Sequence, residues 1–83
     1  MTEKEFKEKV REEHISPNIW SIEDLKEDRI CMRRAHGIWE CFYYERGREF
    51  DNKIFYSEAE AYSFFYDRVK SLHLCHIKYN VKI

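Results

Sequence analysis

The spacing of apolar residues predicts a helix at the start of the chain. Thr2 and Glu5 form a capping-box pair, in which each side chain accepts a hydrogen bond from a backbone amide of the first turn. Phe6 and Val10 follow four residues apart and form a narrow apolar stripe between charged residues. Because Pro17 has no amide hydrogen and restricts the residue before it, the helix should end near His14 or Ile15.

Segments of period-two alternation in the middle of the chain predict a three-stranded antiparallel meander. The expected strands are Arg29 to Ala35, Ile38 to Glu45 and Glu49 to Tyr56. His-Gly and Arg-Gly pairs separate them, and glycine suits such tight reversals because it tolerates positive φ. The second strand is apolar on both faces, which predicts a central position in the sheet. Before the meander, Asn18 to Asp28 should form a packed connection with one helical turn, anchored by Trp20.

The helix expected after the strands has the clearest pattern in the chain. Ser57 and Glu60 form a second capping-box pair, and apolar residues then recur at helical spacing. Tyr62 and Tyr66 lie four residues apart and form a separate stripe on the flank of this helix. The last segment, Cys75 to Ile83, alternates apolar and polar residues, which favours either a fourth, edge strand or a frayed tail.

Together these elements predict one α+β domain over residues 1–83: an N-terminal helix, a three-stranded antiparallel meander, a second helix and, in one of the two alternatives, a C-terminal edge strand. An 83-residue chain is too short for a second core, and 43% hydrophobic residues are enough for folding. The helices either cover one face of the sheet each, or both cover the same face and leave an aromatic surface open. The expected core residues are Trp20, Trp39, Phe42, Phe55, Phe64, Phe65 and Val69.

Charge is dense but balanced, because 15 Lys and Arg residues face 16 Asp and Glu residues and the formal net charge is -1. No global field attracts nucleic acid or an anionic membrane. The first residues contain no apolar leader segment, and no stretch approaches the roughly 18 apolar residues of a membrane span. The three cysteines form no CxxC pair, which fits a reducing compartment. We therefore expect a cytoplasmic protein without membrane attachment.

Histidine and cysteine gather near the C-terminus but do not match a metal site. His73, Cys75 and His76 lack the paired spacing of zinc ligands, and the other thiols, Cys31 and Cys41, lie on the predicted hairpin. With two glycines in the chain, a P-loop, a dinucleotide fingerprint and a glycine-rich oxyanion loop are all excluded. We expect no metal, no cofactor and no catalytic residue.

Arginines form one local basic stretch. Arg29, Arg33 and Arg34 lie on the first predicted strand, close to Arg46 and Arg48 at the second reversal. Such a cluster suits a small RNA-binding or regulatory module, which is the alternative function that the sequence leaves open. In a chain with 37% charged residues, a solvated surface paired with Asp and Glu is the more common outcome.

The middle of the chain also carries a family-like pattern. Trp39 precedes Tyr-Tyr-Glu-Arg-Gly at 43–47, and Phe55 precedes Ser-Glu-x-Glu-Ala at 57–61 and an aromatic helix. This pattern resembles small immunity proteins of bacterial polymorphic toxin and contact-dependent inhibition systems, over roughly residues 18–72. The resemblance implies a non-enzymatic inhibitor that binds a cognate toxin domain stoichiometrically.

The reversal between the second and third strands is the partner-binding region that this resemblance implies. Tyrosine and arginine are over-represented at protein interfaces. The partner-binding candidates are Tyr43, Tyr44, Glu45, Arg46, Arg48 and Asp51, with Tyr62 and Tyr66 as anchors on the helix flank. Acidic groups for a basic toxin would be Glu40, Glu45, Glu49 and Asp51. The edge segment Cys75 to Ile83 would also allow a homodimer.

Overall fold

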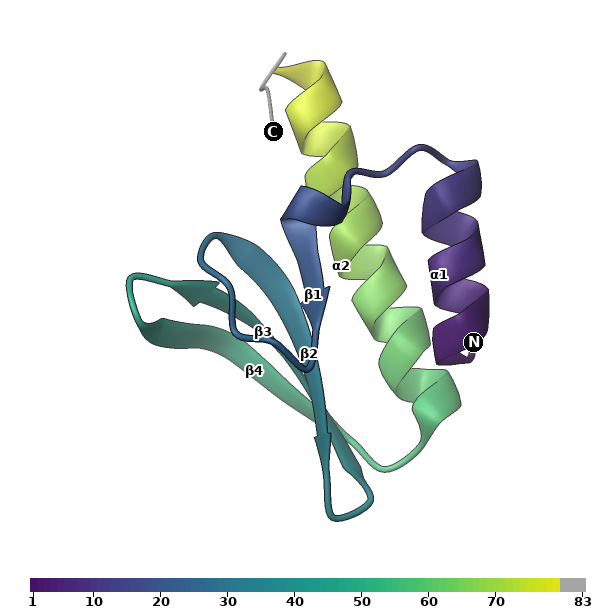
Figure 1. Cartoon of the computed structure of the whole chain (residues 1–83), viewed down its shortest axis with the longest axis vertical. Coiled ribbons are helices and arrows are strands. Elements are labelled where there is room, and N and C mark those ends of the chain that lie inside the picture. Colours follow the sequence, from purple (N-terminus) through teal and green to yellow (C-terminus); the bar gives the residue numbers. More distant parts are fainter. Residues whose placement is uncertain (80–83) are drawn as a thin grey trace.

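The computed structural model describes residues 1–79 and has an α+β architecture (Figure 1). The elements in chain order are α1 (Glu3–Glu12), the 3-10 turn η1 (Pro17–Ile19), β1 (Trp20–Ile22), β2 (Arg29–Ala35), β3 (Ile38–Glu45), β4 (Arg48–Phe55) and α2 (Glu58–Lys78). The strands form one sheet in the order β1-β2-β3-β4. β1 is parallel to β2 and the other neighbours are antiparallel, so the predicted class is confirmed and a fourth strand is added.

Both helices begin where the capping pairs predict. The Thr2 hydroxyl accepts from the Glu5 amide and the Glu5 carboxylate accepts from the Thr2 amide, which completes a capping box. At α2 the Ser57 hydroxyl accepts from the Glu60 amide, which is half of the predicted pair. α1 ends at Glu12, slightly before the expected end near His14 or Ile15, because His14 has a positive φ of 56° that is not helical.

The predicted hairpins are confirmed, and their turns have a defined type. β2 and β3 have the expected limits, and β4 is shifted toward the N-terminus by one residue. The φ angles are 54° and 74° at His36 and Gly37, and 52° and 74° at Arg46 and Gly47. Positive φ at both central residues defines a type I′ turn, whose twist matches that of the flanking strands. β3 lies between two strands, as its apolar faces predict.

β1 is the strand that the alternation pattern did not reveal. The segment from Asn18 to Asp28 contains the expected helical turn at η1, but Trp20–Ile22 then pairs with residues 30–32 of β2. Three residues are too few to show a period of two. The pairing is also parallel, so it depends on a crossover through residues 23–28 rather than on a local turn.

The expected strand or tail after residue 75 is wrong as far as residue 79. α2 continues through Lys78, with Tyr79 as its C-cap, and residues 80–83 lie outside the described part of the chain. No glycine or proline lies between Ser57 and Tyr79, so neither of these helix breakers interrupts α2 there. Residues 75–79 therefore offer no strand edge through which a second copy of the chain could pair.

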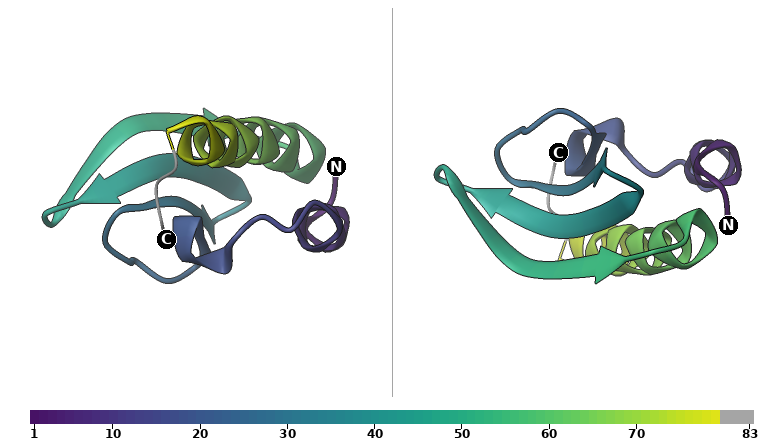
Figure 2. Two further views of the ribbon diagram at one scale, coloured as in Figure 1. Left: turned by 90° about the horizontal axis from the view of Figure 1, so that it is seen from above. Right: turned by 90° about the horizontal axis from the view of Figure 1, so that it is seen from below.

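Both helices lie on the same face of the sheet. Figure 2 shows α2 against the curved sheet with α1 beside it. The core joins Phe6 of α1 and Phe65 of α2 to Ile30, Met32 and Cys41, which share one face of β2 and β3. The structure therefore has the second of the two expected layouts, in which both helices cover the same face, and within residues 1–79 no helix covers the other face.

Aromatic rings connect the two helices with the sheet. The Phe6 ring lies 4.6 Å from the Phe65 ring and meets the Trp20 ring edge-on at 5.1 Å. Of the expected core residues, Phe42, Phe65 and Val69 are fully buried. The others are partly buried against the core: Trp20, Trp39, Phe55 and Phe64.

A carboxylate at the end of α1 ties the helices together. Glu13 accepts hydrogen bonds from the Tyr66 hydroxyl at 2.6 Å and from Lys70 Nζ at 2.7 Å. These two donors hold the pKa of the Glu13 carboxyl below its ordinary value. Burial, together with the hydrogen bond to Glu13, raises the pKa of Tyr66 to about 12.

The buried ring of Phe6 generates a stability prediction. Phe6→Ala should lower the free energy of unfolding by about 3 kcal/mol or more, because it leaves a cavity among three packed rings. Phe50→Ala is the matched control, since Phe50 is 43% exposed and should cost far less. Urea denaturation followed by circular dichroism measures both, and equal losses would contradict this account of the core.

The Glu13 contacts generate a pH-dependent prediction. Since the carboxyl pKa is lowered in the folded state, its stabilisation is present above the ordinary value of 4.5 and is lost as the pH falls below it. Glu13→Gln should therefore reduce the free energy of unfolding at pH 7 by about 0.5 kcal/mol and by much less at pH 3. The exposed neighbour Glu12→Gln is the control. A Glu13→Gln deficit that is as large at pH 3 as at pH 7 would refute the assignment.

Candidate functional site

The face of the sheet opposite the helices, here called the open face, is the first candidate surface. Cross-strand register places Cys31 opposite Phe42, Arg33 opposite Glu40, and Tyr44 opposite Glu49. These residues alternate with the core-facing ones, so they share the open face. The open face consists of Cys31, Arg33, Glu40, Phe42, Tyr44, Glu49, Asn52 and Ile54.

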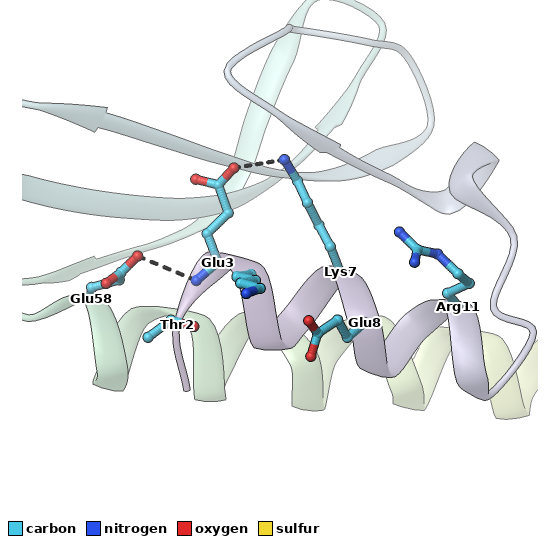
Figure 3. A pocket seen from close by; sticks show the side chains of 7 residues that line it. Thr2, Glu3, Lys7, Glu8, Arg11 and Glu58 are labelled. Atoms are coloured by element: carbon cyan, nitrogen blue, oxygen red, sulfur yellow. Dashed lines mark hydrogen bonds and ion pairs between the residues drawn. The ribbon is translucent and has the colours of Figure 1, made fainter.

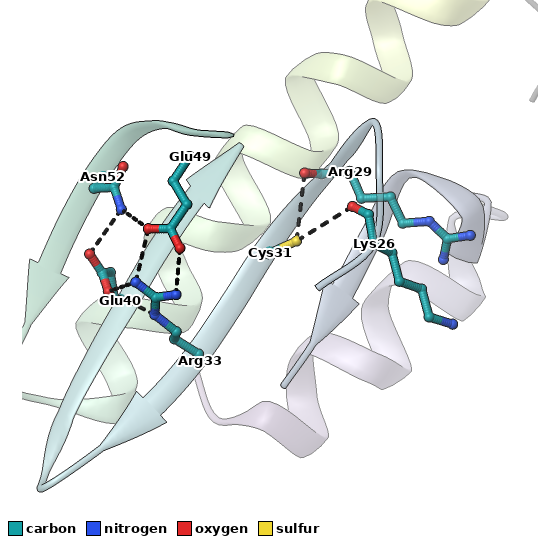
Figure 4. Close-up of polar contacts among 7 residues, drawn as sticks. All are labelled: Lys26, Arg29, Cys31, Arg33, Glu40, Glu49 and Asn52. Atoms are coloured by element: carbon teal, nitrogen blue, oxygen red, sulfur yellow. Dashed lines mark hydrogen bonds and ion pairs between the residues drawn. The ribbon is translucent and has the colours of Figure 1, made fainter. Parts of the chain in front are cut away.

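A charged network occupies the centre of the open face (Figure 4). The Arg33 guanidinium donates to Glu40 Oε1 at 2.6 Å and to Glu49 Oε2 at 2.7 Å. Asn52 Nδ2 donates to the same two carboxylates at 3.0 and 2.9 Å. Arg33 and Asn52 also lower the pKa of the Glu49 carboxyl. Four side chains from three strands are thus held in one arrangement.

This network covers an aromatic ring. Phe42 has no exposed surface although it lies on the face without a helix. The Arg33 guanidinium carbon lies 4.5 Å from the centre of the Phe42 ring, a cation-π contact. The flat face of the guanidinium therefore covers the Phe42 ring, and the N–H groups at its edges donate to the two carboxylates.

Residues 23–28, here called the crossover loop, lie against the same face and bind the β3–β4 turn. The Glu27 carboxylate accepts from the amides of Arg46 and Gly47, the latter at 3.1 Å. The Asp28 amide donates to the Tyr44 carbonyl at 2.8 Å. Cys31 Sγ lies 4.0 Å from the Lys26 carbonyl oxygen beneath the loop (Figure 4). A carboxylate that caps two turn amides fixes the turn without using its side chains.

The structure gathers four of the eight predicted binding residues around the β3–β4 turn. Tyr44 lies on the open face and is half-buried, and Glu45 is half-buried at the end of β3. Arg46 and Arg48 are exposed on the turn and line a shallow hollow with Glu45 and Phe50. Asp51 is exposed farther along β4, where its φ of 54° marks a bulge opposite Phe42.

Three predicted tyrosines lie elsewhere. Tyr43 packs against the core on the helix side, and burial raises the pKa of its hydroxyl. Tyr62 is 2% exposed, and its hydroxyl lies 3.4 Å from Glu3 Oε1. Tyr66 donates to Glu13 between the helices. The structure therefore does not bring these tyrosines to the surface around the turn.

The arginines of the alternative function do not form one basic patch. Arg33 is bound to two carboxylates, and Arg29 donates to the Pro17 carbonyl at 3.3 Å. Arg34 stacks over Trp39, which faces the helices, with its guanidinium carbon 4.8 Å from the ring centre. This distribution counts against a phosphate-binding surface built from the cluster.

Sequence reasoning missed several residues that shape this surface. Glu27 was not singled out, because nothing in a loop carboxylate indicates that it caps a distant turn. Ile54 is 55% exposed on the open face, and Phe50, opposite Tyr43 on the other face, is 43% exposed. Every residue of β4 except Phe55 is exposed. Phe50 and Ile54 could both have been found from the sequence, because they are apolar side chains on a strand predicted to lie at the sheet edge.

The hollow beside the start of α1 is not a candidate site (Figure 3). Glu3 pairs with Lys7 at 2.8 Å, and the Glu3 amide donates to Glu58 Oε2 at 3.2 Å. Glu3, Lys7 and Glu58 therefore already bind one another there. Within residues 1–79, no group of three or more His, Cys, Asp or Glu side chains is placed to hold a metal ion.

The thiols of the sheet are poorly suited to nucleophilic chemistry. Cys31 and Cys41 are buried free thiols, and burial raises the pKa of Cys41 to about 11. Burial also raises the pKa of Cys31.

Among the described helices, none is both long and apolar enough to cross a membrane.

Comparisons of the chain with protein-family models, curated proteins and solved structures give no match.

The open-face network generates a prediction about stability. Arg33→Ala should lower the free energy of unfolding by about 2 kcal/mol, because it uncovers Phe42 and leaves two carboxylates without their shared cation. Arg48→Ala, an exposed arginine on β4, should change it by less than about 0.5 kcal/mol. Urea denaturation compares the two variants, and indistinguishable midpoints would show that the guanidinium does not stabilise the sheet.

Proposed function

We propose that the protein is a non-enzymatic inhibitor that binds a cognate bacterial toxin domain one to one and thereby neutralises it. The proposal joins the resemblance of residues 18–72 to small immunity proteins with the properties of the open face. The main supporting observation is that the open face holds its charged groups in fixed positions beside the exposed side chain of Ile54 and the half-buried ring of Tyr44.

Fixed side chains favour protein binding because they lose little conformational freedom when a partner binds. Arg33, Glu40, Glu49 and Asn52 are ordered by mutual hydrogen bonds before any partner arrives. Glu27 fixes the neighbouring turn through its amides, so the side chains of that turn stay available.

Apolar side chains beside the network supply candidate anchors. On the open face, Ile54 is 55% exposed and Tyr44 is half-buried. Tyrosine and other large side chains at the centre of an interface carry most of the binding energy. A rim of charged residues around such anchors is the usual composition of a protein interface.

The charge pattern defines what kind of partner surface would fit. Of the four acidic groups expected for a basic toxin, Glu40 and Glu49 are neutralised by Arg33. Glu45 and Asp51 remain, next to Arg46 and Arg48. A partner with alternating charges fits this end of the sheet better than a uniformly basic one, so binding should depend only moderately on salt.

Affinity purification of a tagged copy from the bacterium that makes the protein tests the proposal. We expect a one-to-one complex with the C-terminal fragment of a large secreted protein. Expression of that fragment alone should arrest growth, and co-expression of the wild-type protein should restore it.

Variants then connect the rescue with the open face. Tyr44→Ala combined with Ile54→Asp should abolish rescue while circular dichroism shows an intact fold. Ile77→Asp is the matched control, because Ile77 is 62% exposed but lies on α2. Recovery of RNA alone would overturn the inhibitor proposal, and full rescue by the double variant would remove the open face from it.

A further inference from the structure

A second groove lies along β1, at the edge of the sheet opposite β4. Two adjoining hollows share Lys7, Pro17 and Trp20 and together run between α1, η1 and β1. We call them the β1 groove. It contains none of the residues of the open face.

The floor of the β1 groove is apolar and firmly supported. Val10, Ile15, Pro17 and Trp20 line the part between α1 and η1. The Trp20 ring rests edge-on against Phe6 at 5.1 Å, so it is held in place from the core side. Trp20 Nε1 is buried and has no hydrogen-bond partner among residues 1–79.

The rim of the β1 groove is basic. It carries five basic residues and one acidic residue, Asp24; the basic ones are Lys7, Arg11, His14, Lys26 and Arg29. Lys7 is paired with Glu3, and Arg29 donates to the Pro17 carbonyl. Within residues 1–79, Arg11, His14 and Lys26 make no ion pair. In a chain of net charge -1, this local excess favours an acidic occupant.

The backbone of β1 offers hydrogen bonds along the same groove. β1 pairs on one side with β2, and the Glu23 amide donates to the Met32 carbonyl. In a parallel ladder alternate residues bond the same neighbour, so Ser21 and Glu23 face β2. The backbone groups of Trp20 and Ile22 therefore point to the outer edge, which no strand of the described chain covers.

From these observations we infer that the β1 groove binds an extended acidic segment of a partner protein. The segment lies alongside β1, pairs with its outer backbone groups, places an apolar side chain against Trp20, and its carboxylates face Arg11, His14 and Lys26. A nucleic acid is the less suitable occupant, because single-strand sites normally stack bases on several exposed rings and this groove has one. The inference concerns a different surface from the inhibitor proposal and does not depend on it.

Fluorescence anisotropy of the full chain tests the inference with three labelled probes. They are an octapeptide of alternating Glu and Leu, its counterpart with Lys in place of Glu, and octauridylate. We expect saturable binding of the acidic peptide, at least tenfold tighter than either of the other probes.

Charge reversal locates the binding. Arg11→Glu combined with Lys26→Glu should weaken binding of the acidic peptide about tenfold, as expected for two reversed surface charges. The matched control, Arg48→Glu with Lys53→Glu on β4, should leave it unchanged within twofold. Circular dichroism confirms that both double variants keep the fold.

Amide and indole resonances give an independent readout. On addition of the acidic peptide, the Trp20 indole and the Ile22 amide should shift, whereas the amides of residues 48–55 should not. The inference is overturned if the acidic peptide does not bind saturably, if octauridylate binds as tightly, or if the control variant loses binding to the same extent.

Discussion

Phe42 must be buried on the face of the sheet that neither helix covers, and much of the structure is arranged around this constraint. β3 is apolar on both sides, but both helices pack on one of them. Arg33 resolves the conflict by placing its guanidinium over the ring, and a guanidinium in that position requires acceptors. Glu40 and Glu49 supply them, and Asn52 holds the two carboxylates. The polar groups that cover Phe42 in place of a helix thus form an ordered polar surface.

The covering of Phe42 by this network explains why the open face is suited to binding a partner protein. Its charged groups cannot reorient freely, because their positions are set by the need to keep Phe42 out of water. The same groups are partly neutralised by one another, which explains why the sequence contains many charges but the surface has no strong field of one sign. The β1 groove differs in kind, because its cations lie around an apolar floor and are incompletely paired.

Features that depend on residues close together in the sequence could be predicted, whereas features that depend on residues far apart could not. Capping pairs, type I′ turns and helical spacing act within a few residues, so both helices and the hairpins were predicted correctly. Pattern reading failed at β1, which forms by parallel pairing with β2, and at Cys75 to Tyr79, where the alternation predicted a strand or a tail but α2 continues. At the candidate site, alternation separated Tyr43 from Tyr44, but only the tertiary arrangement shows that the helices cover Tyr43.

The pairing of α1 with α2 also has a consequence for the order of folding. The contacts of Glu13 with Tyr66 and Lys70 span 53 and 57 residues, whereas β2, β3 and β4 are joined by two-residue turns. Local contacts close quickly and distant ones pay a larger loop-closure entropy. The meander with α2 is therefore expected to assemble first, and α1 to dock onto it last. During synthesis α1 leaves the ribosome before its binding surface exists, so Phe6 and Val10 stay exposed until α2 has been made.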